Sequence, residues 1–159
     1  MLKYCRVTAT ALCAATLLLS SLSTAVSADD VAGLTSVASQ SSVQQTADKL
    51  VTILEKKGMT VFNRIDHAKG AQGAGVELPP TQLIIFGNPK IGSQLMLCSQ
   101  TTAIDLPQKM LIWQDDNGKV WLGYNSPDYL KSRHHIDGCQ QILAKVNKAL
   151  SAFAQAASQ

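Results

Sequence analysis

Hydrophobic and polar positions alternate most clearly around a turn in the second half of the chain. Two runs rich in β-branched, aromatic and long apolar residues lie within 106–125 and flank Asn117 and Gly118. An Asn-Gly pair readily adopts the positive φ angles of a tight turn, so this stretch predicts a β-hairpin. Large apolar groups fall on both faces of the hairpin, which favours a central place in a sheet covered on more than one side.

The register of this hairpin has two alternatives. A two-residue loop pairs Trp113 with Leu122, whereas a three-residue loop with Gly118 in a bulge pairs Trp113 with Trp121. The difference matters because a shift of one residue moves the side chains of one strand to the opposite face.

The segments before the hairpin predict three strands and one well-defined helix. Strands are expected at 34–39, 59–66 and 81–87. Ser42 and Gln45 form the capping-box pattern that starts a helix, and apolar residues then recur at spacings of three and four as far as Gly58. The glycine-rich segment from His67 to Gly75 is expected to be a loop.

Proline marks the start of two further helices. Asn88-Pro89 and Ser126-Pro127 each combine an N-cap residue with proline at the first helical position. A helix at the C-terminus is also expected, with Asp137 as its cap, an apolar stripe on its inner face and a frayed end at 154–159.

Together these elements predict an α+β fold with an antiparallel sheet. The hairpin is central in the sheet, helices pack on one face, and the C-terminal helix is an addition to this plan. A second apolar sheet face with Trp113 or Trp121 on it favours a homodimer, since such faces are seldom left wet. The alternative is that the C-terminal helix covers that face within one chain.

The start of the chain is typical of a secretory signal peptide. Lys3 and Arg6 precede an apolar and small-residue run at 9–22, and Ala28 fits a small-residue cleavage site. The run is too short to cross a bilayer comfortably, which disfavours a transmembrane anchor. We expect cleavage after Ala28, a single domain at 29–159, a periplasmic or extracellular location and no stable membrane anchor after cleavage.

Charge and cysteine content narrow the functional classes. Loss of Lys3 and Arg6 lowers the formal net charge of +3 by two, and no run of like charge remains, so no nucleic-acid partner is expected. Cys98 and Cys139 remain in the exported domain. Both fall on inward stripes of predicted helices, and this predicts a disulfide between them.

An ordered set of short motifs resembles the family called domain of unknown function 302. The likeness covers about 34–136, which is most of the expected mature chain. Its motifs are Arg64-Ile65-Asp66-His67, Phe86-Gly87-Asn88-Pro89, Leu95-Met96, Asp105-Leu106-Pro107 with Lys109, Trp113 before Gly118-Lys119-Val120-Trp121, Tyr124-Asn125, and Tyr129-Leu130 with Arg133-His134. The resemblance implies a small α+β fold, a sheet backed by helices and a tendency to dimerise. It implies no established activity, and the second imidazole of His134-His135 departs from the pattern, in which that position is usually small.

Five polar residues are the candidate ligand-binding site. They lie near the ends of predicted strands or helices and are His67, Lys109, Arg133, Asn88 and Asn125. If they converge, they could bind a small anion or carboxylate, and if they lie apart, they are ordinary caps and solvated charges. The site is expected where the loop that begins at His67 meets the ends of the central strands, because its glycines allow a backbone to approach a ligand closely.

Metal and catalytic chemistry have less support. His67, His134 and His135 could hold zinc or copper, but adjacent imidazoles on a helix are about 100° apart and rarely bind one ion. Asp66 beside His67 could orient the imidazole, or it could satisfy the end of its own strand. No nucleophile motif is present, so no catalytic residue, cofactor or metal site is assigned.

The sequence therefore favours a non-enzymatic exported protein that binds a small ligand, with an anion as one option, or a protein partner. The alternative is a metal- or redox-linked accessory that uses His67, His134 or His135.

Overall fold

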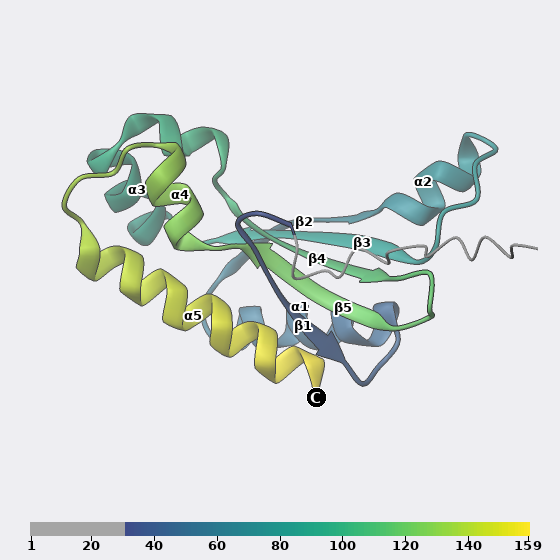
Figure 1. Cartoon of the computed structure of the whole chain (residues 1–159). Helices are drawn as coiled ribbons and strands as arrows, with labels where there is room; N and C mark the ends of the chain where they lie inside the picture. The colour runs from purple at the N-terminus through teal and green to yellow at the C-terminus, as the bar shows by residue number, and fades with distance from the viewer. Residues whose placement is uncertain (1–30) are drawn as a thin grey trace, which may run out of the picture.

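The computed structural model describes residues 31–159, so the expected signal peptide and its cleavage after Ala28 lie outside the described residues. The described part contains one five-stranded antiparallel sheet in the order β1-β5-β4-β3-β2 (Figure 1). The strands are β1 (Leu34–Ser39), β2 (Thr60–Asp66), β3 (Thr81–Gly87), β4 (Gln108–Gln114) and β5 (Val120–Asn125).

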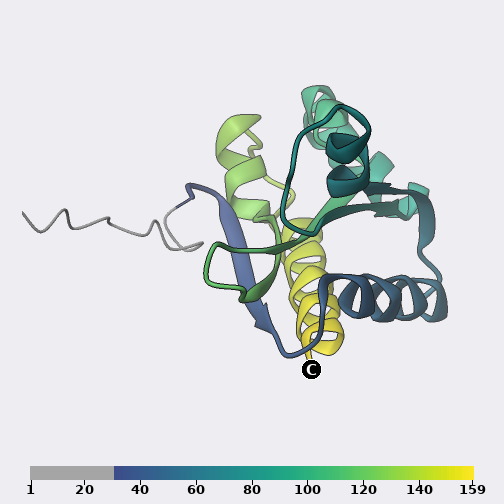
Figure 2. The ribbon, with the colours of Figure 1, turned by 90° about the vertical axis from the view of Figure 1, so that its right-hand side faces the viewer.

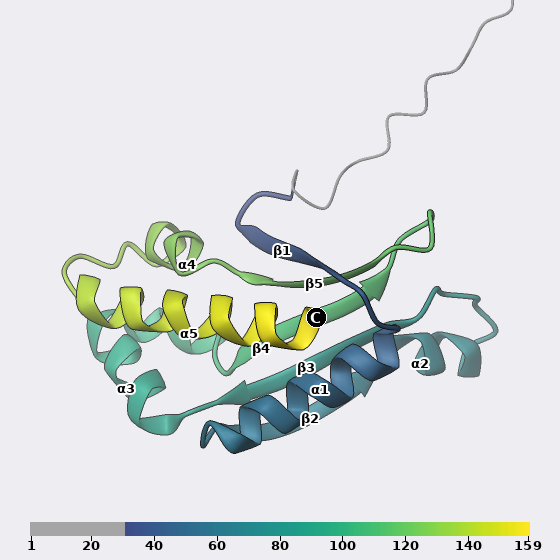
Figure 3. The ribbon, with the colours of Figure 1, turned by 90° about the horizontal axis from the view of Figure 1, so that it is seen from below.

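Helices occupy three of the four connections between these strands and the segment after β5. They are α1 (Val43–Lys56), α2 (His67–Gly73), α3 (Pro89–Cys98), the 3-10 helix η2 (Gln100–Ile104), α4 (Pro127–Arg133) and α5 (Gln140–Ser158). Both α1 and α5 lie on the same face of the sheet, side by side (Figures 2 and 3). The predicted α+β fold, with its antiparallel sheet and helices on one face, is confirmed.

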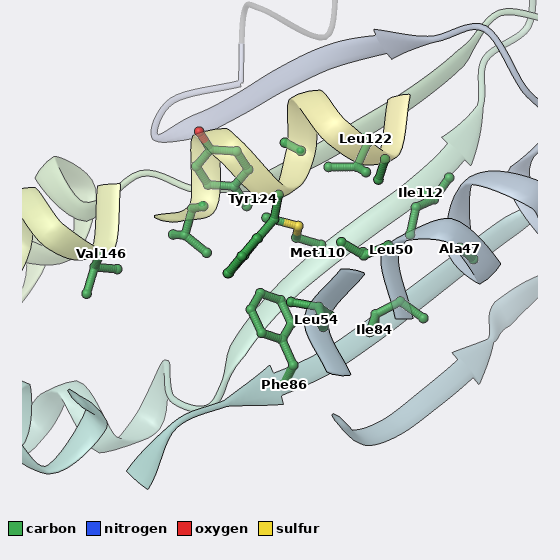
Figure 4. Packing of buried hydrophobic residues seen from close by; sticks show 14 of the residues in the cluster. Ala47, Leu50, Leu54, Ile84, Phe86, Met110, Ile112, Leu122, Tyr124 and Val146 are labelled. Carbon is green, nitrogen blue, oxygen red and sulfur yellow. The ribbon is translucent and has the colours of Figure 1, made fainter. Parts of the chain in front are cut away.

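The sheet alternates buried and part-exposed residues as a sheet with helices on one face requires. The buried positions of β3, β4 and β5 are Ile84, Phe86, Met110, Ile112, Leu122 and Tyr124, each at most 4% exposed. They meet Leu50 and Leu54 of α1, which are fully buried (Figure 4). They also meet Phe153 of α5, whose ring lies edge-on to Phe86 with centroids 6.2 Å apart. The core therefore lies between one sheet face and two helices.

The central hairpin adopts the second of the two predicted registers. Trp113 pairs with Trp121, and the N–H of Asp115 donates to the carbonyl of Lys119 at 2.9 Å. Gly118 has φ +78°, a conformation that favours glycine at the end of a three-residue loop.

Three of the predicted helix starts are confirmed by side-chain caps. Ser42 and Gln45 form the expected capping box at α1. Asn88 and Ser126 cap α3 and α4, each followed by proline at the start of the helix.

Residues 67–73 form α2, and the prediction of a loop there is wrong. The carboxylate of Asp66 accepts from the N–H of Lys69 at 2.9 Å and so caps the helix. This short helix has no buried residue, so it lacks the apolar periodicity that would reveal it in the sequence.

Both expected ends of the C-terminal helix are also corrected. The residue at the N-cap position is Cys139, not Asp137, and its side chain makes no capping hydrogen bond. The C-terminal end is ordered as helix to Ser158, because Ala154 and Ala157 are fully buried and the carbonyl of Ser158 accepts from the N–H of Gln40 at 2.9 Å.

Candidate functional site

A cavity of about 430 Å³ lies between α3 and α5, at the end of the sheet where β3 ends and β4 begins. Figure 1 shows α3 and the first turns of α5 at this end of the molecule. Further walls come from Met59 and Phe62 at the start of β2 and from the segment that leads into β4. The volume falls within the range of about 300–1,000 Å³ that is usual for small-molecule pockets.

The walls of the cavity are almost entirely apolar. The largest side chains that line it are Phe86, Leu95, Leu106, Val146, Leu150 and Phe153. Four of these residues (Phe86, Leu95, Leu150 and Phe153) are at most 6% exposed, so the inner wall is continuous with the hydrophobic core. A molecule with many polar groups would leave them without hydrogen bonds here, which disfavours sugars and nucleotides.

Four polar side chains also line the cavity, and they are Asn88, Ser93, Gln108 and Lys145. The amide nitrogen of Gln108 is buried and has no hydrogen-bond partner in the described part of the chain. Such a group is usually satisfied by water or a ligand, because an unpaired buried donor costs about 1–3 kcal/mol. Lys145 is exposed and forms no hydrogen bond or ion pair with a described residue.

Local sequence explains how α3 reaches this position. The side chain of Asn88 accepts from the N–H of Lys90 at 3.0 Å, which fixes the first turn of the helix. Ile91 and Leu95 follow four residues apart, so both lie on the face of α3 that lines the cavity.

A second polar cluster surrounds the carboxylate of Asp105, just after η2. One carboxylate oxygen lies 2.6 Å from Nε2 of His134, and the other lies 3.3 Å from Nη1 of Arg133. The Nδ1 atom of His134 lies 3.0 Å from the hydroxyl of Thr101. With a proton on Nε2 facing the carboxylate, neutral His134 accepts a hydrogen bond from Thr101.

This cluster fastens the α3–η2 segment to the start of the C-terminal region. The hydroxyl of Ser99 donates to the carbonyl of His134 at 3.0 Å. Cys98 and Cys139 are joined in a disulfide with Cα atoms 6.4 Å apart. The segment that covers the cavity is therefore held by a covalent bond and by buried polar contacts.

Two of the candidate site residues come together, but not around a ligand. Lys109 donates to the backbone carbonyls of Asp105 and Pro107, at 2.8 and 3.0 Å. Arg133 contacts the carboxylate of the same Asp105. Both cations therefore stabilise the chain around 105–107, and neither lines the cavity.

The structure does not assemble the site expected around His67. His67 is exposed at the start of α2, directly after the end of β2. The last residue of β2, Asp66, lies opposite Gln82 of β3, and Gln82 lies opposite Ile112 of β4. The cavity lies near Gln108, four residues along β4 from Ile112, or about 13 Å at 3.3 Å per residue. The reason is the antiparallel order of the sheet, which places the end of β2 opposite the end that holds α3.

The remaining two candidates also separate. Asn88 caps α3 and lines the cavity, whereas Asn125 is exposed at the end of β5, paired with Leu34. Asn88 is the one member of the predicted set that lies in the cavity.

The histidines do not form a metal site in residues 31–159. His67 lies on α2, His134 has both ring nitrogens engaged, and His135 is exposed with φ +48°. Within these residues no group of three or more His, Cys, Asp or Glu side chains is placed to hold a metal ion. The carboxylate of Asp66 caps α2 and is not paired with His67.

The face of the sheet opposite α1 and α5 carries a row of part-exposed apolar residues. They are Leu83, Ile85, Leu111, Trp113 and Trp121, and we call this surface the open face. The indole rings of Trp113 and Trp121 stack with centroids 6.5 Å apart. The C-terminal helix does not cover this face, since α5 packs beside α1 on the other side (Figure 3).

Asp115 holds the edge of the open face in place. Its carboxylate accepts from Nε1 of Trp121 at 2.8 Å and from the backbone N–H groups of Asn117 and Lys119, each at 2.9 Å. The bond from Trp121 is the main reason that the pKa of Asp115 is lowered from its usual value, and the two backbone donors act in the same direction. The Nζ atom of Lys119 lies 3.9 Å from the centre of the Trp121 ring.

The cavity was not anticipated from the sequence, although a signal for it exists. Both α3 and α5 carry a stripe of apolar residues on the face that lines the cavity, for example Leu95 on α3 and Val146 on α5. Each stripe could be recognised alone, but the empty space between them depends on how far apart the two helices lie.

The fold and the cavity define a small α+β sheet domain with a ligand-sized hollow beside its helical layer. Residues 35–153 match the family described as Domain of unknown function DUF302, and the chain belongs to this family. A crystal structure of an uncharacterized conserved protein DUF302 from Bacillus stearothermophilus has the same fold, with a TM-score of 0.72. The similarity covers 79% of this chain and 98% of that chain at 19% sequence identity.

The chain is also similar to part of longer proteins from Brucella. It is 47% identical over 104 residues to the Fluoride-specific ion channel FluC 1 of Brucella suis, a match that covers 65% of this chain and 41% of that protein. The same identity relates it to the Fluoride-specific ion channel FluC 2 of Brucella melitensis, of which 38% is covered. The chain thus spans about two fifths of the length of these curated relatives.

Among residues 31–159, no helix combines the length and the apolar character that crossing a membrane requires.

The lowered pKa of Asp115 predicts a pH-dependent contribution to stability. A carboxyl whose pKa is lower in the folded state than in the unfolded state stabilises the fold above the unfolded pKa of about 3.9. This stabilisation is lost as the pH falls through the folded pKa. The Asp115→Asn variant should therefore unfold more readily than the wild type at pH 7 in urea titrations. The difference between the two should shrink below about pH 4.

The matched control is Asp116→Asn, at the exposed neighbour in the same turn. A stability difference between wild type and Asp115→Asn that stays constant down to the acid limit would contradict a role for the carboxylate charge.

Proposed function

We propose that this protein is a non-enzymatic binding protein that acts outside the cytoplasm and holds a small, largely apolar molecule between α3 and α5. The cavity of about 430 Å³ with apolar walls is the observation that carries this proposal. Few polar side chains line the cavity, and these can orient a ligand without supplying a nucleophile and base in contact. The expected export by a leader at 1–28 supports the location.

The contacts of Asp105 with His134 and Arg133 indicate that these charged and titratable side chains have a structural role. His134 has 4% of its side chain exposed and both ring nitrogens occupied, so it stabilises the cover of the cavity. The near neighbours of Asp105 in the chain that line the cavity include Ala103, Leu106 and Pro107, whose side chains are apolar.

Filling the cavity should abolish binding without unfolding the protein. Ala149 lies on α5 and lines the cavity, so Ala149→Phe would place a ring in the space that the ligand needs. We expect the affinity for a neutral fluorescent probe such as 1-aminonaphthalene to fall at least about tenfold, or about 1.4 kcal/mol. Fluorescence titration measures the affinity, and thermal unfolding checks that the variant is folded.

Ala152→Phe is the matched control, because Ala152 is an exposed residue of the same helix that does not line the cavity. Equal probe affinity in the wild type and in both variants would show that the probe binds elsewhere and would contradict the proposal.

The open face supports a second part of the proposal, that two chains pair through it. Leu111, Trp113 and Trp121 form its centre and are only partly buried within one chain. Apolar sheet faces of this kind usually mark a protein contact, and aromatic residues are enriched in such contacts.

A charge at the centre of the open face should separate the dimer. We expect Leu111→Lys to be monomeric at micromolar concentration in sedimentation velocity, because pairing would bury an unpaired ammonium group. Ala144→Lys, on the exposed surface of α5, should leave the association unchanged. A wild-type protein that sediments as a monomer, or a Leu111→Lys variant that remains dimeric, would count against this interface.

The similarity to part of the Brucella proteins favours one candidate for a further partner, a membrane channel. In those chains the matched 104 residues occupy about two fifths of a protein that carries the name of a fluoride-specific ion channel. Segments that are joined in one chain are held at high effective concentration, so even weak contacts between them persist. The present chain would form the same contact.

Co-purification tests this candidate. The chain should be retained by the tagged remainder of the Brucella suis relative in detergent, and the Leu111→Lys variant shows whether the open face carries the contact. Absence of retention at micromolar concentration would remove the channel as a partner and leave the cavity proposal untouched.

A further inference from the structure

The two helices that enclose the cavity carry only positive charge. Lys90 lies on α3, Lys145 and Lys148 lie on α5, and neither helix contains an Asp or a Glu. The nearest acidic group in the connecting segment, Asp105, is already engaged with Arg133 and His134. The electrostatic potential between the two helices therefore favours an anion.

Lys145 is placed to meet the charged end of a bound molecule. It lines the cavity and also a neighbouring hollow of about 380 Å³ beside the disulfide, so it lies where the two spaces meet. It is exposed and has no hydrogen bond or ion pair with a described residue. Its ammonium group is therefore free to pair with a ligand while its methylene stem packs on the apolar wall.

The cavity volume limits the size of the apolar part. A water molecule takes a share of about 30 Å³ in the liquid, and a volume of about 430 Å³ thus corresponds to roughly fourteen non-hydrogen atoms. The largely apolar walls disfavour a second charged group inside. The unpaired amide nitrogen of Gln108 is a single neutral donor, which a water molecule beside the ligand satisfies. One charged end and an apolar body of this size describe a single-chain amphiphile.

We infer that the protein binds an anionic amphiphile, a free carboxylate with a hydrocarbon chain of about twelve carbons, with its chain between α3 and α5 and its carboxylate at Lys145. This inference rests on the proposed function of the cavity and adds the chemical class of the ligand. A carboxylate carries the single negative charge that one lysine neutralises.

Calorimetry with the exported form of the protein tests the apolar part first. Across the series from octanoate to hexadecanoate, each added methylene should lower the Kd about fourfold, the equivalent of about 0.8 kcal/mol. The gain should stop near dodecanoate or tetradecanoate, when the cavity is full. A Kd that keeps falling to hexadecanoate, or one that does not depend on chain length, would overturn the size argument.

The head group is tested with dodecanoate, dodecanol and dodecylammonium at low ionic strength. Dodecanoate should bind most tightly, and Lys145→Gln should weaken it roughly two- to fivefold, with the difference reduced by salt. Binding of dodecanol should not change. Lys148→Gln is the control on the same helix, because Lys148 does not line the cavity. If dodecylammonium binds as tightly as dodecanoate, or if Lys145→Gln has no effect on dodecanoate, the anionic class is wrong.

The outcomes separate this inference from the function on which it rests. Tight binding of dodecanol with no preference for dodecanoate refutes the anionic head group and leaves a binding cavity. Failure of all three compounds to bind refutes both. Binding to vesicles of anionic phospholipid without binding of free dodecanoate would assign the surface to a membrane, and loss of self-association in Ala149→Phe would assign it to a second copy of the chain. Either result overturns the inference.

Discussion

The packing of α5 along the helix-covered face of the sheet is the contact on which the rest of the structure depends. α5 has 19 residues and is about 28 Å long, whereas a seven-residue strand such as β4 spans about 23 Å. Its C-terminal end is fixed against the segment after β1, where Gln40 donates to the carbonyl of Ser158. The first turns of α5 therefore extend past the end of the sheet. Their apolar residues do not pack against a strand and must be covered by another element.

That cover is α3, and the space between α3 and α5 is the cavity. Two helices that meet beyond the edge of a sheet have no third layer of side chains to fill the gap between them. Cys98–Cys139 and the contacts of His134 with Thr101 and Asp105 hold the α3–η2 segment in this position. The same position of α5 leaves the opposite side of the sheet as the open face, so one contact explains both the hollow and the exposed apolar surface.

How much the sequence could predict follows from how local each signal is. A cap such as Ser42 or Asn88 bonds only to the first turn of its own helix, so it can be recognised from the local sequence. The helix starts predicted from these two caps are confirmed. The sequence allows two registers for the hairpin because the same Asn117-Gly118 pair suits both loops, and the choice depends on how Gly118 joins the ladder. The α2 helix was missed because its stability comes from a cap rather than from a buried face.

The location of the site could not be predicted for a different reason. His67, Lys109 and Arg133 all lie near element ends, but a sequence does not say at which end of an antiparallel sheet each one falls. The strand register places His67 at the end of the sheet opposite the cavity. Asn88 is the one predicted site residue that lines the cavity. Lys145 was missed because in the sequence it is an ordinary exposed lysine on a helix. It lines a cavity only because α3 packs beside α5 in the fold.

Methyl-resolved NMR during a titration with dodecanoate tests whether the protein binds its ligand in the cavity between α3 and α5. We expect the methyl signals of Ile91, Leu95 and Val146, which line the cavity, to shift together with one affinity. Those of Ile85 and Leu111 on the open face should stay unchanged. Shifts confined to the open face, or no shift at Ile91, Leu95 and Val146 when the ligand is in excess, would contradict binding in the cavity.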